Sequence, residues 1–335
     1  MRMIFSVIGT LVLSAVISCK RQPETPVSSA AMEDVTTFRG EVRQHYNNRR
    51  FAELEEIASK VRSGKERVRY GDWKIYHFYQ AMDCREDEQE SMWKLHEQIH
   101  REWLEKFPQS ITARVAQAEF LTTYAWHARS DATAKYVSEE GWRLFHERLA
   151  AARTVLDQSK SLSPACPMWW YTCQTVALGQ EWSRGEYDAL FASAKAFEPE
   201  FFPYDCSRAK YLLPRWHGKP GEWEEVAEKQ IKLQGATGSE IYARVVQEQE
   251  GYYDNIFQRS AASWRKTRKG FDDLRTHYPD SLELLNTYCR MACIAGDREQ
   301  ARKLFGEIGE NKVQSCWRVK GDEYERAKAW AMASK

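Results

Sequence analysis

Every strong apolar pattern in this chain repeats with the period of an α-helix. One set of apolar residues recurs at spacings of three and four and ends at a glycine that can close a helix: Phe51, Leu54, Ile57, Ala58, Val61 and Gly64. No stretch alternates apolar and polar residues with the period of two that a half-buried strand needs. Glycine (17) and proline (10) are scarce for 335 residues, which disfavours a turn-rich β fold and long disordered tracts. The sequence therefore predicts an all-α fold.

The same periodicity predicts helices over residues 73–82, 91–107, 111–129 and 142–156. In the second of these segments, five apolar residues are expected to share the buried face: Met92, Leu95, Ile99, Trp103 and Phe107. A further helix face is expected from Tyr187, Phe191, Ala194 and Phe197. The chain therefore contains enough amphipathic helices to build a large helical core.

Several helices end on the same pattern, a large residue followed closely by proline: Phe107-Pro108, Leu162-Ser163-Pro164, Phe197-Glu198-Pro199 and Tyr278-Pro279. The spacing between two of these prolines, Pro164 and Pro199, is close to the 34-residue period of tetratricopeptide repeats. The unit around the Ala295-Gly296-Asp297 turn resembles such a repeat, although Leu285 replaces the expected aromatic residue. We therefore expect residues 36–335 to form one tetratricopeptide-like α-solenoid of irregular antiparallel helix pairs, with a concave inner face.

The N-terminus has the pattern of an export signal. Arg2 precedes an uncharged apolar run over residues 4–17, which is too short to cross ~30 Å of hydrocarbon but fits a secretory signal peptide. Val16-Ile17-Ser18-Cys19 resembles the lipobox of bacterial lipoproteins, which implies removal of residues 1–18 and lipidation of Cys19. An ordinary cleaved signal or an uncleaved anchor is the alternative. Residues 19–35 would then be the lipidated cysteine and a flexible tether, and Lys20 favours the outer membrane of a Gram-negative host.

A wider resemblance begins at Trp126. Trp126 and Arg129, Gly141-Trp142 with Phe145, and Tyr211-Leu212-Leu213-Pro214-Arg215-Trp216 with Gly218 are similar to an uncharacterised family of bacterial helical-repeat domains. The likeness covers about residues 50 to 310 and implies a helical-repeat fold but no particular activity; Lys219-Pro220-Gly221-Glu222-Trp223 departs from the expected polar helix cap.

Four residues in these motifs are candidate ligand-binding residues: Trp126, Arg129, Arg215 and Trp216. A tryptophan can stack on a ligand while a guanidinium holds a carboxylate. The alternative, which we favour, is that the tryptophans pack between helix layers and the arginines pair with helix C-termini.

His96-Glu97-Gln98-Ile99-His100 is an H-E-x-x-H string inside the predicted helix 91–107. Two histidines four residues apart can hold zinc on one helix face, while Glu97 activates a bound water. Glu119 lies nineteen residues after His100, a spacing that resembles the third ligand of Glu-type zinc peptidases. A zinc-dependent hydrolase is therefore an alternative function for this chain.

Other features oppose this alternative. Both histidines fall within the arc of the predicted apolar face, and Lys94 and Arg101 are charged where such peptidases carry uncharged residues. These peptidases lay their substrate along a β-strand, and no strand is predicted upstream. We therefore favour core-edge histidines, with no catalytic residue, no metal and no cofactor.

Composition limits the remaining classes of function. The chain has 49 basic and 48 acidic residues, a net charge of +1, so no nucleic-acid partner is expected.

Lipidation of Cys19 would leave seven of the eight cysteines, an odd number, so at least one thiol stays unpaired in a monomer. Cys166 with Cys173 is one disulfide candidate in an exported protein. Phosphate-binding G-x-x-x-x-G-K, dinucleotide-binding G-x-G-x-x-G and hydrolase G-x-S-x-G motifs are absent from the sequence.

The sequence favours an exported protein that is lipid-anchored to a bacterial membrane and presents its helical repeats to an unidentified envelope protein or peptide. The first alternative is the zinc hydrolase that uses His96, His100 and Glu119 as ligands and Glu97 as general base. The second is envelope glycan binding through exposed tryptophans such as those in Trp169-Trp170-Tyr171.

Overall fold

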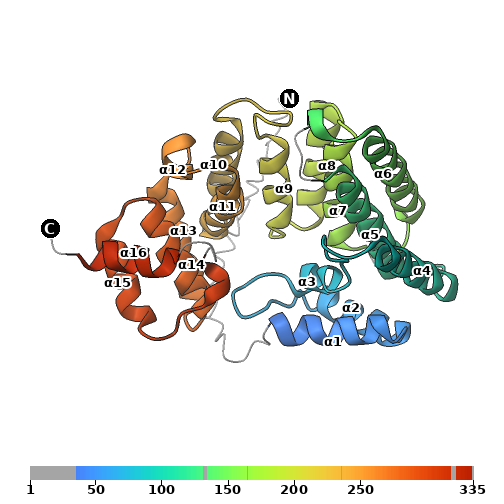
Figure 1. Ribbon diagram of the computed structural model, residues 1–335, viewed down its shortest axis with the longest axis horizontal. Helices are drawn as coiled ribbons and strands as arrows, with labels where there is room; N and C mark the ends of the chain where they lie inside the picture. Colours follow the sequence, from blue (N-terminus) through green and yellow to red (C-terminus); the bar gives the residue numbers. More distant parts are fainter. Residues whose placement is uncertain (1–34, 131–133, 164, 235, 318–321, 334–335) are drawn as a thin grey trace, which may run out of the picture.

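The computed structural model describes residues 35–130, 134–163, 165–234, 236–317 and 322–333, and these residues form an all-α fold (Figure 1). The α-helices are α1 (Val35–Asn47), α2 (Phe51–Ser63), α3 (Lys74–Gln80), α4 (Glu90–Lys106), α5 (Ile111–Arg129), α6 (Glu139–Ser159), α7 (Pro167–Gly179), α8 (Arg184–Phe197), α9 (Pro203–Tyr211), α10 (Glu222–Gln234), α11 (Ala236–Gln249), α12 (Ile256–Arg259), α13 (Trp264–His277), α14 (Leu282–Ile294), α15 (Arg298–Ile308) and α16 (Glu323–Met332). Within the described residues there is no strand, only one isolated bridge between Arg67 and Trp73.

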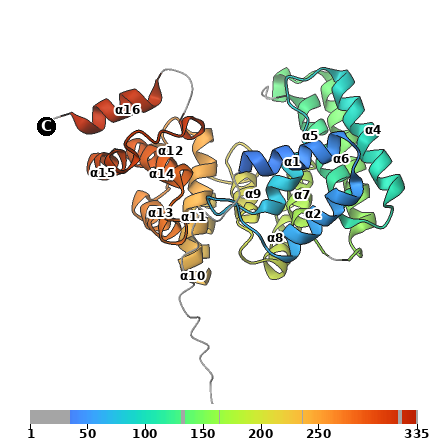
Figure 2. The same ribbon diagram turned by 90° about the horizontal axis from the view of Figure 1, so that it is seen from below.

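Helices pack mainly on those that follow them in the chain. The main contacts join α4 to α5, α5 to α6, α7 to α8 and α9, α9 to α11, α10 to α11, α11 to α13, and α14 to α15. In Figure 1 this succession bends into an arch, with α4 to α8 on one side and α10 to α16 on the other. Figures 1 and 2 both place α1 to α3 against the side formed by α4 to α9.

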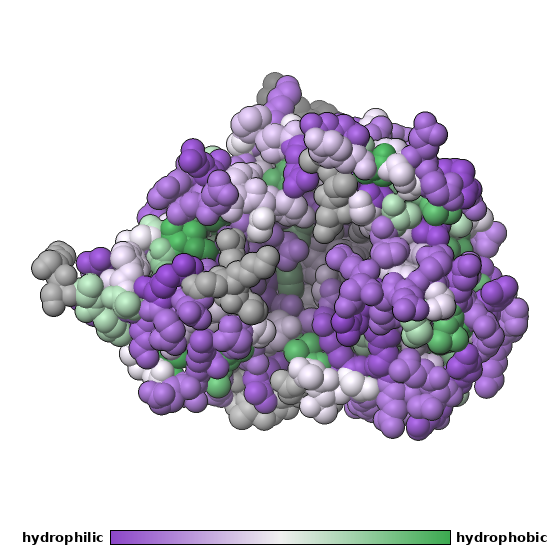
Figure 3. Space-filling model, in the orientation of Figure 1, coloured by the Kyte–Doolittle hydropathy of each residue, from purple (hydrophilic) through white to green (hydrophobic). Residues whose placement is uncertain are grey.

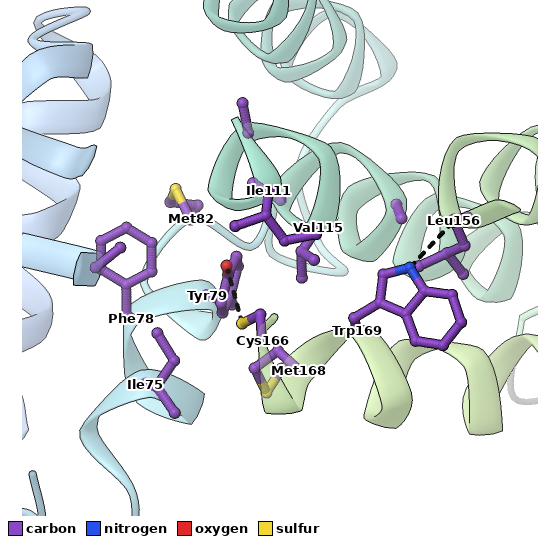
Figure 4. Packing of buried hydrophobic residues seen from close by; sticks show 14 of the residues in the cluster. Ile75, Phe78, Tyr79, Met82, Ile111, Val115, Leu156, Cys166, Met168 and Trp169 are labelled. Atoms are coloured by element: carbon purple, nitrogen blue, oxygen red, sulfur yellow. Dashed lines mark hydrogen bonds between the residues drawn. The ribbon is translucent and has the colours of Figure 1, made fainter. Parts of the chain in front are cut away.

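Two large apolar cores fill the arch and meet at α7 to α9. The first extends from Phe38 to Tyr204, and Figure 4 shows a part of it in which α3, α5 and α7 meet. There the Tyr79 hydroxyl lies 3.6 Å from the Cys166 sulfur. The second core extends from Ala177 to Ala331. Three half-buried side chains touch both cores and so join them: Trp126, Leu190 and Phe202.

The segment between α2 and α3 braces the first side of the arch against the second. Arg244 of α11 donates from Nη1 to Asp72 Oδ1 at 2.6 Å and from Nη2 to the Tyr70 carbonyl at 2.7 Å. Gly71 has a φ of +86°, and a Cβ added there would lie 2.4 Å from the Tyr278 ring. We call residues 64–73 the brace, because these contacts join parts of the chain that are far apart in sequence.

Several sequence predictions are confirmed at the level of single helices. Helix α2 ends at Gly64, and α5 has the predicted bounds, with the Ser110 hydroxyl accepting a hydrogen bond from the Ala113 N–H as an N-cap. The turn between α14 and α15 contains Gly296 at a φ of +73°. These helices follow local rules of periodicity and capping, which is why the sequence predicts them.

The predicted buried face of α4 is wrong in two positions. Met92 and Leu95 are exposed, whereas the buried residues of α4 are Trp93, His96, Ile99, His100 and Trp103. Trp93 has the larger apolar surface, and its burial turns the helix so that both histidines face inward. Phe197 of α8 is likewise 41% exposed, although its predicted partners Tyr187, Phe191 and Ala194 are buried.

The predicted signal peptide, Cys19 and the tether up to residue 34 lie outside the described residues. In the part of the chain that the structure describes, no helix is long and apolar enough to cross a membrane. The seven cysteines within that part are all free, so Cys166 and Cys173 are not bonded to each other.

Candidate functional site

The H-E-x-x-H string lies on α4, where its histidines are buried and its glutamate is exposed. His96 and His100 are 3% and 2% exposed, while Glu97 is exposed to solvent. The Tyr46 ring from α1 lies against both imidazoles, with centroid distances of 5.4 and 5.2 Å. His96 Nδ1 is 3.2 Å from the Tyr46 hydroxyl and 3.2 Å from the Met82 carbonyl. Glu97 is therefore badly placed to act on anything that the histidines hold.

His100 is enclosed by rings and lacks polar contacts. Its centroid lies 5.0 Å from that of Phe120 on α5, and neither of its ring nitrogens has a hydrogen-bond partner among the residues that the structure describes. Burial, with the nearby His96 and Arg43, lowers the pKa of His100 to about 3. His100 is therefore a neutral core residue in this structure.

Glu119 points away from the histidines. It accepts a hydrogen bond from the Thr172 hydroxyl on α7, and burial raises the pKa of its carboxyl to about 8. Neighbouring residues on a helix differ by about 100° in direction, so Phe120 reaches His100 while Glu119 reaches α7. The structure thus does not bring His96, His100 and Glu119 together as the ligands of one metal ion.

A different group of potential ligands does come together. Among the described residues, one set of three or more such side chains has its ligand atoms within 4.8 Å of one another: Cys84, Glu88 and His96. Cys84 and Glu88 lie in the connection between α3 and α4. The sequence does not reveal this group, because its residues show no familiar metal-binding spacing.

The four candidate binding residues converge on one pocket of about 570 Å³. We call it the indole pocket; its aromatic and charged lining residues are Glu86, Trp93, Trp126, His127, Arg129, Lys210, Arg215, Trp216 and Tyr252. Trp126 and Arg129 lie in the last turn of α5, and Arg215 and Trp216 lie in the loop after α9. Residues that are about ninety positions apart in sequence thus share one surface.

The loop that carries Trp216 folds back tightly on the end of α9. The backbone N–H of Trp216 donates to the Leu213 carbonyl at 2.8 Å, and the backbone N–H of His217 donates to the Tyr211 carbonyl at 3.1 Å. A Cβ at Gly218 would lie 1.8 Å from the Leu212 carbonyl oxygen, so only glycine fits there. These contacts fix the backbone from which the Trp216 side chain projects.

Cations and indole rings alternate within the indole pocket. The Trp126 and Trp216 rings meet edge to face at a centroid distance of 5.7 Å. The Arg129 guanidinium lies 5.6 Å from the Trp126 centroid and 5.5 Å from the Trp216 centroid, at distances typical of cation–π contacts. Arg215 lies 5.7 Å from the Tyr252 ring. The tryptophans thus pack on each other and on arginine while still lining a pocket.

Three indole N–H groups of the pocket residues are buried without a hydrogen-bond partner: those of Trp93, Trp126 and Trp216. A buried donor without a partner costs about 1–3 kcal/mol. All three donors are closed to solvent, so they belong to the packed wall of the pocket. The contrast is Trp169, whose N–H donates to the Leu156 carbonyl at 3.0 Å within the core (Figure 4), so Trp169 is not an exposed platform for sugars.

Next to the indole pocket lies a second pocket of about 150 Å³, which we call the central groove. Its main lining residues are Asp72, Tyr76, Tyr171, Phe202, Cys206, Lys210, Glu248 and Tyr252. Figure 3 shows that the molecule is hollowed near its middle in this view. Lys210 and Tyr252 line both the groove and the indole pocket. Sequence reasoning missed both residues, because they meet Trp126 only through the packing of α9 and α11.

The chain matches no family model, and neither a curated protein nor a solved structure matches it. The resemblance to bacterial helical-repeat domains therefore stays a prediction.

Proposed function

We propose that this protein is a lipid-anchored bacterial envelope protein whose helical domain binds a peptide segment of a partner protein. One observation carries the proposal: the indole pocket adjoins the central groove and shares Lys210 and Tyr252 with it. An extended segment lying in the groove would place one end among the indoles and the cations.

We also infer that the helices belong to a tetratricopeptide-like solenoid. Successive helices pack on one another along the chain, and the turn at Gly296 separates α14 from α15 as in such repeats. The brace is a departure from a regular solenoid, because residues 64–73 take up part of the inner side. A bound segment would therefore run beside the brace.

The charges of the indole pocket favour an anionic group. Among the described residues that line the pocket there are three cations, Arg129, Lys210 and Arg215, and one acid, Glu86. Arginine binds a carboxylate through a planar fork, and lysine adds a positive point charge. We therefore expect a peptide that ends in a carboxylate or carries acidic side chains.

The test is a selection of displayed peptides on the purified mature protein, followed by affinity measurements with Trp216→Ala. We expect acidic or free C-terminal peptides to be enriched, and Trp216→Ala to weaken their binding at least tenfold. Trp330→Ala is the matched control, because Trp330 also pairs with an arginine, Arg298 at 5.1 Å, but outside the groove. No enrichment, or equal binding to Trp216→Ala, would contradict the proposal.

Glycan binding is a second candidate, supported by the cluster of Trp126, Trp142 and Trp216 around Arg129. Sugar rings stack on such aromatic faces. Titration with soluble peptidoglycan fragments would then quench the tryptophan fluorescence, and the quenching would be lost in Trp216→Ala. Unchanged emission at saturating fragment concentration would exclude this candidate.

A further inference from the structure

Cys84, Glu88 and His96 form a compact group with three different ligand types. Their sulfur, oxygen and nitrogen atoms lie within 4.8 Å of one another. Cys84 and His96 are 5% and 3% exposed, whereas Glu88 is half-buried. The Cys84 thiol donates a hydrogen bond to Glu88 Oε2 at 3.1 Å. The group is thus protected on one side and reachable from solvent on the other.

We propose that Cys84, Glu88 and His96 bind one divalent transition-metal ion, with zinc as the best fit. Zinc takes thiolate, imidazole and carboxylate ligands at about 2.0–2.3 Å, so its donor atoms sit roughly 3.3–3.7 Å apart in a tetrahedron. The observed spacing therefore needs closure by only about 1 Å. Three protein ligands leave the fourth position for a water molecule.

The surroundings of His96 orient it as a ligand. Its Nδ1 lies 3.2 Å from the Met82 carbonyl, which can only accept a hydrogen bond. The Nδ1–H tautomer satisfies this contact and leaves the lone pair on Nε2. Metal-bound histidines commonly donate their other N–H to a carbonyl in this way, and such contacts raise metal affinity. The Tyr46 hydroxyl, 3.2 Å from the same Nδ1, further fixes the ring.

Charge and packing also suit a dication. On binding, the Cys84 thiol loses its proton to solvent and forms a metal–sulfur bond, and the proton's hydrogen bond to Glu88 is replaced by a metal–oxygen bond. The thiolate and the carboxylate then balance the two positive charges. Cys84 packs in a small apolar cluster with Trp93, Phe120 and Tyr124, which shields its side of the site from water.

This site differs from the one that the H-E-x-x-H string suggests. It shares His96 with that string but not His100 or Glu119, and Glu97 lies on the exposed face of α4. We therefore assign metal binding without hydrolysis. The ion would tie the connection between α3 and α4 to the middle of α4.

The test uses the mature protein, purified under reducing conditions without chelator. Elemental analysis is expected to find close to one zinc per chain, and titration of the stripped protein with zinc chloride to restore it. Replacing zinc by cobalt(II) should give the absorption of a cobalt–thiolate bond. Cys84→Ser and Glu88→Gln are each expected to weaken zinc binding at least tenfold.

Two matched variants make the result decisive. His100→Gln removes the other histidine of the string, and Cys173→Ser removes a buried thiol elsewhere; both should bind zinc as the parent does. Glu88→Gln changes a half-buried residue, so it remains informative if Cys84→Ser fails to fold. The proposal is overturned if the stripped protein takes up no zinc, or if Glu88→Gln binds as tightly as the parent. Loss of zinc in His100→Gln alone would instead support the string as the ligand set.

Discussion

At the scale of residues, the two histidines of α4 have opposite environments despite their similar burial. His96 has a carbonyl and a hydroxyl within hydrogen-bond distance of Nδ1, whereas both nitrogens of His100 lack a partner. Burying a polar group without a partner costs free energy, because the group loses its hydrogen bonds to water. His100 thus lowers the stability of the fold, while His96 contributes to it.

Replacing His100 tests this difference. At pH 7.5 we expect His100→Leu to unfold in urea with an unchanged free energy, or one higher by up to ~1 kcal/mol, because the orphaned nitrogens disappear. His96→Leu, the matched control, should lose about 1–2 kcal/mol, since Met82 and Tyr46 lose a partner. A loss of more than about 2 kcal/mol in His100→Leu would show that the imidazole has a polar partner.

His100→Leu should also change how the free energy of unfolding depends on pH. The folded protein keeps His100 neutral down to a pKa of about 3, while an unfolded histidine has a pKa near 6.5. Between these values the unfolded state binds more protons, so this residue lowers the unfolding free energy as the pH falls from 6.5. Urea titrations from pH 7 to pH 4 should therefore show a smaller acid-induced loss in His100→Leu. Parallel curves for parent and variant would contradict the low pKa.

At the scale of elements, the brace is an irregular and tightly fitted connection. Lys65 of the brace pairs with Glu198 at 2.7 Å, and the Arg67 guanidinium lies 3.1 Å from the Trp73 ring centroid. Gly71 turns the chain at a left-handed φ directly against Tyr278. This fit requires a residue without a Cβ, for reasons of both backbone conformation and space.

Two glycines with matching φ angles allow the cost of backbone conformation to be measured apart from the cost of steric overlap. Gly221 has a φ of +85° but nothing within 4 Å of an added Cβ, so Gly221→Ala should cost only the ~1 kcal/mol of left-handed strain. Gly71→Ala adds overlap with Tyr278 and with Arg244 Nη2 at 2.8 Å, and we expect a total loss of about 3 kcal/mol or more. Urea unfolding of both variants measures the difference. Equal losses would mean that the brace yields without cost.

Individual helices could be predicted from sequence because their signals are local. The capped ends of α5 and the turn at Gly296 lie within a few residues of the patterns that specify them. The buried face of α4 was wrong because Trp93 competes with Met92 and Leu95 for the interior, and neighbouring helices decide that competition.

The candidate site was predictable only in part. Trp126, Arg129, Arg215 and Trp216 could be named from motifs, but their convergence with Tyr252 depends on how α5, α9 and α11 pack. Nothing in the spacing of the sequence encodes that packing.

At the scale of the whole molecule, the two cores meet at few side chains, and the brace adds a second link between them. Trp126, Leu190 and Phe202 contact both cores, and the Asp72–Arg244 pair joins them on the inner side. The buried Arg244 depends on this partner, because removal of one member of a buried ion pair typically costs 3–5 kcal/mol. These side chains and this ion pair together fix the relative position of the two sides, and with it the width of the central groove.

The proposed anchoring of this molecule rests on Cys19, and we expect palmitate labelling to disappear in Cys19→Ala. The lipid chains supply the membrane affinity, so the variant should also move from the membrane to the soluble fraction of disrupted cells. Cys293→Ala, at a half-buried position in α14, is the control and should keep both label and fractionation. Retention of the label in Cys19→Ala would reject lipidation at this residue.

The brace has a consequence for how the chain acquires its shape as it leaves the ribosome. Asp72 and Arg244 are 172 positions apart, so the early segment emerges long before its docking site has been synthesised. Closing so long a loop carries a large entropic cost, which only a nearly finished second half can offset. We therefore expect the N-terminal helices to fold first. The contact between Gly71 and Tyr278 should form last during folding and break first during unfolding.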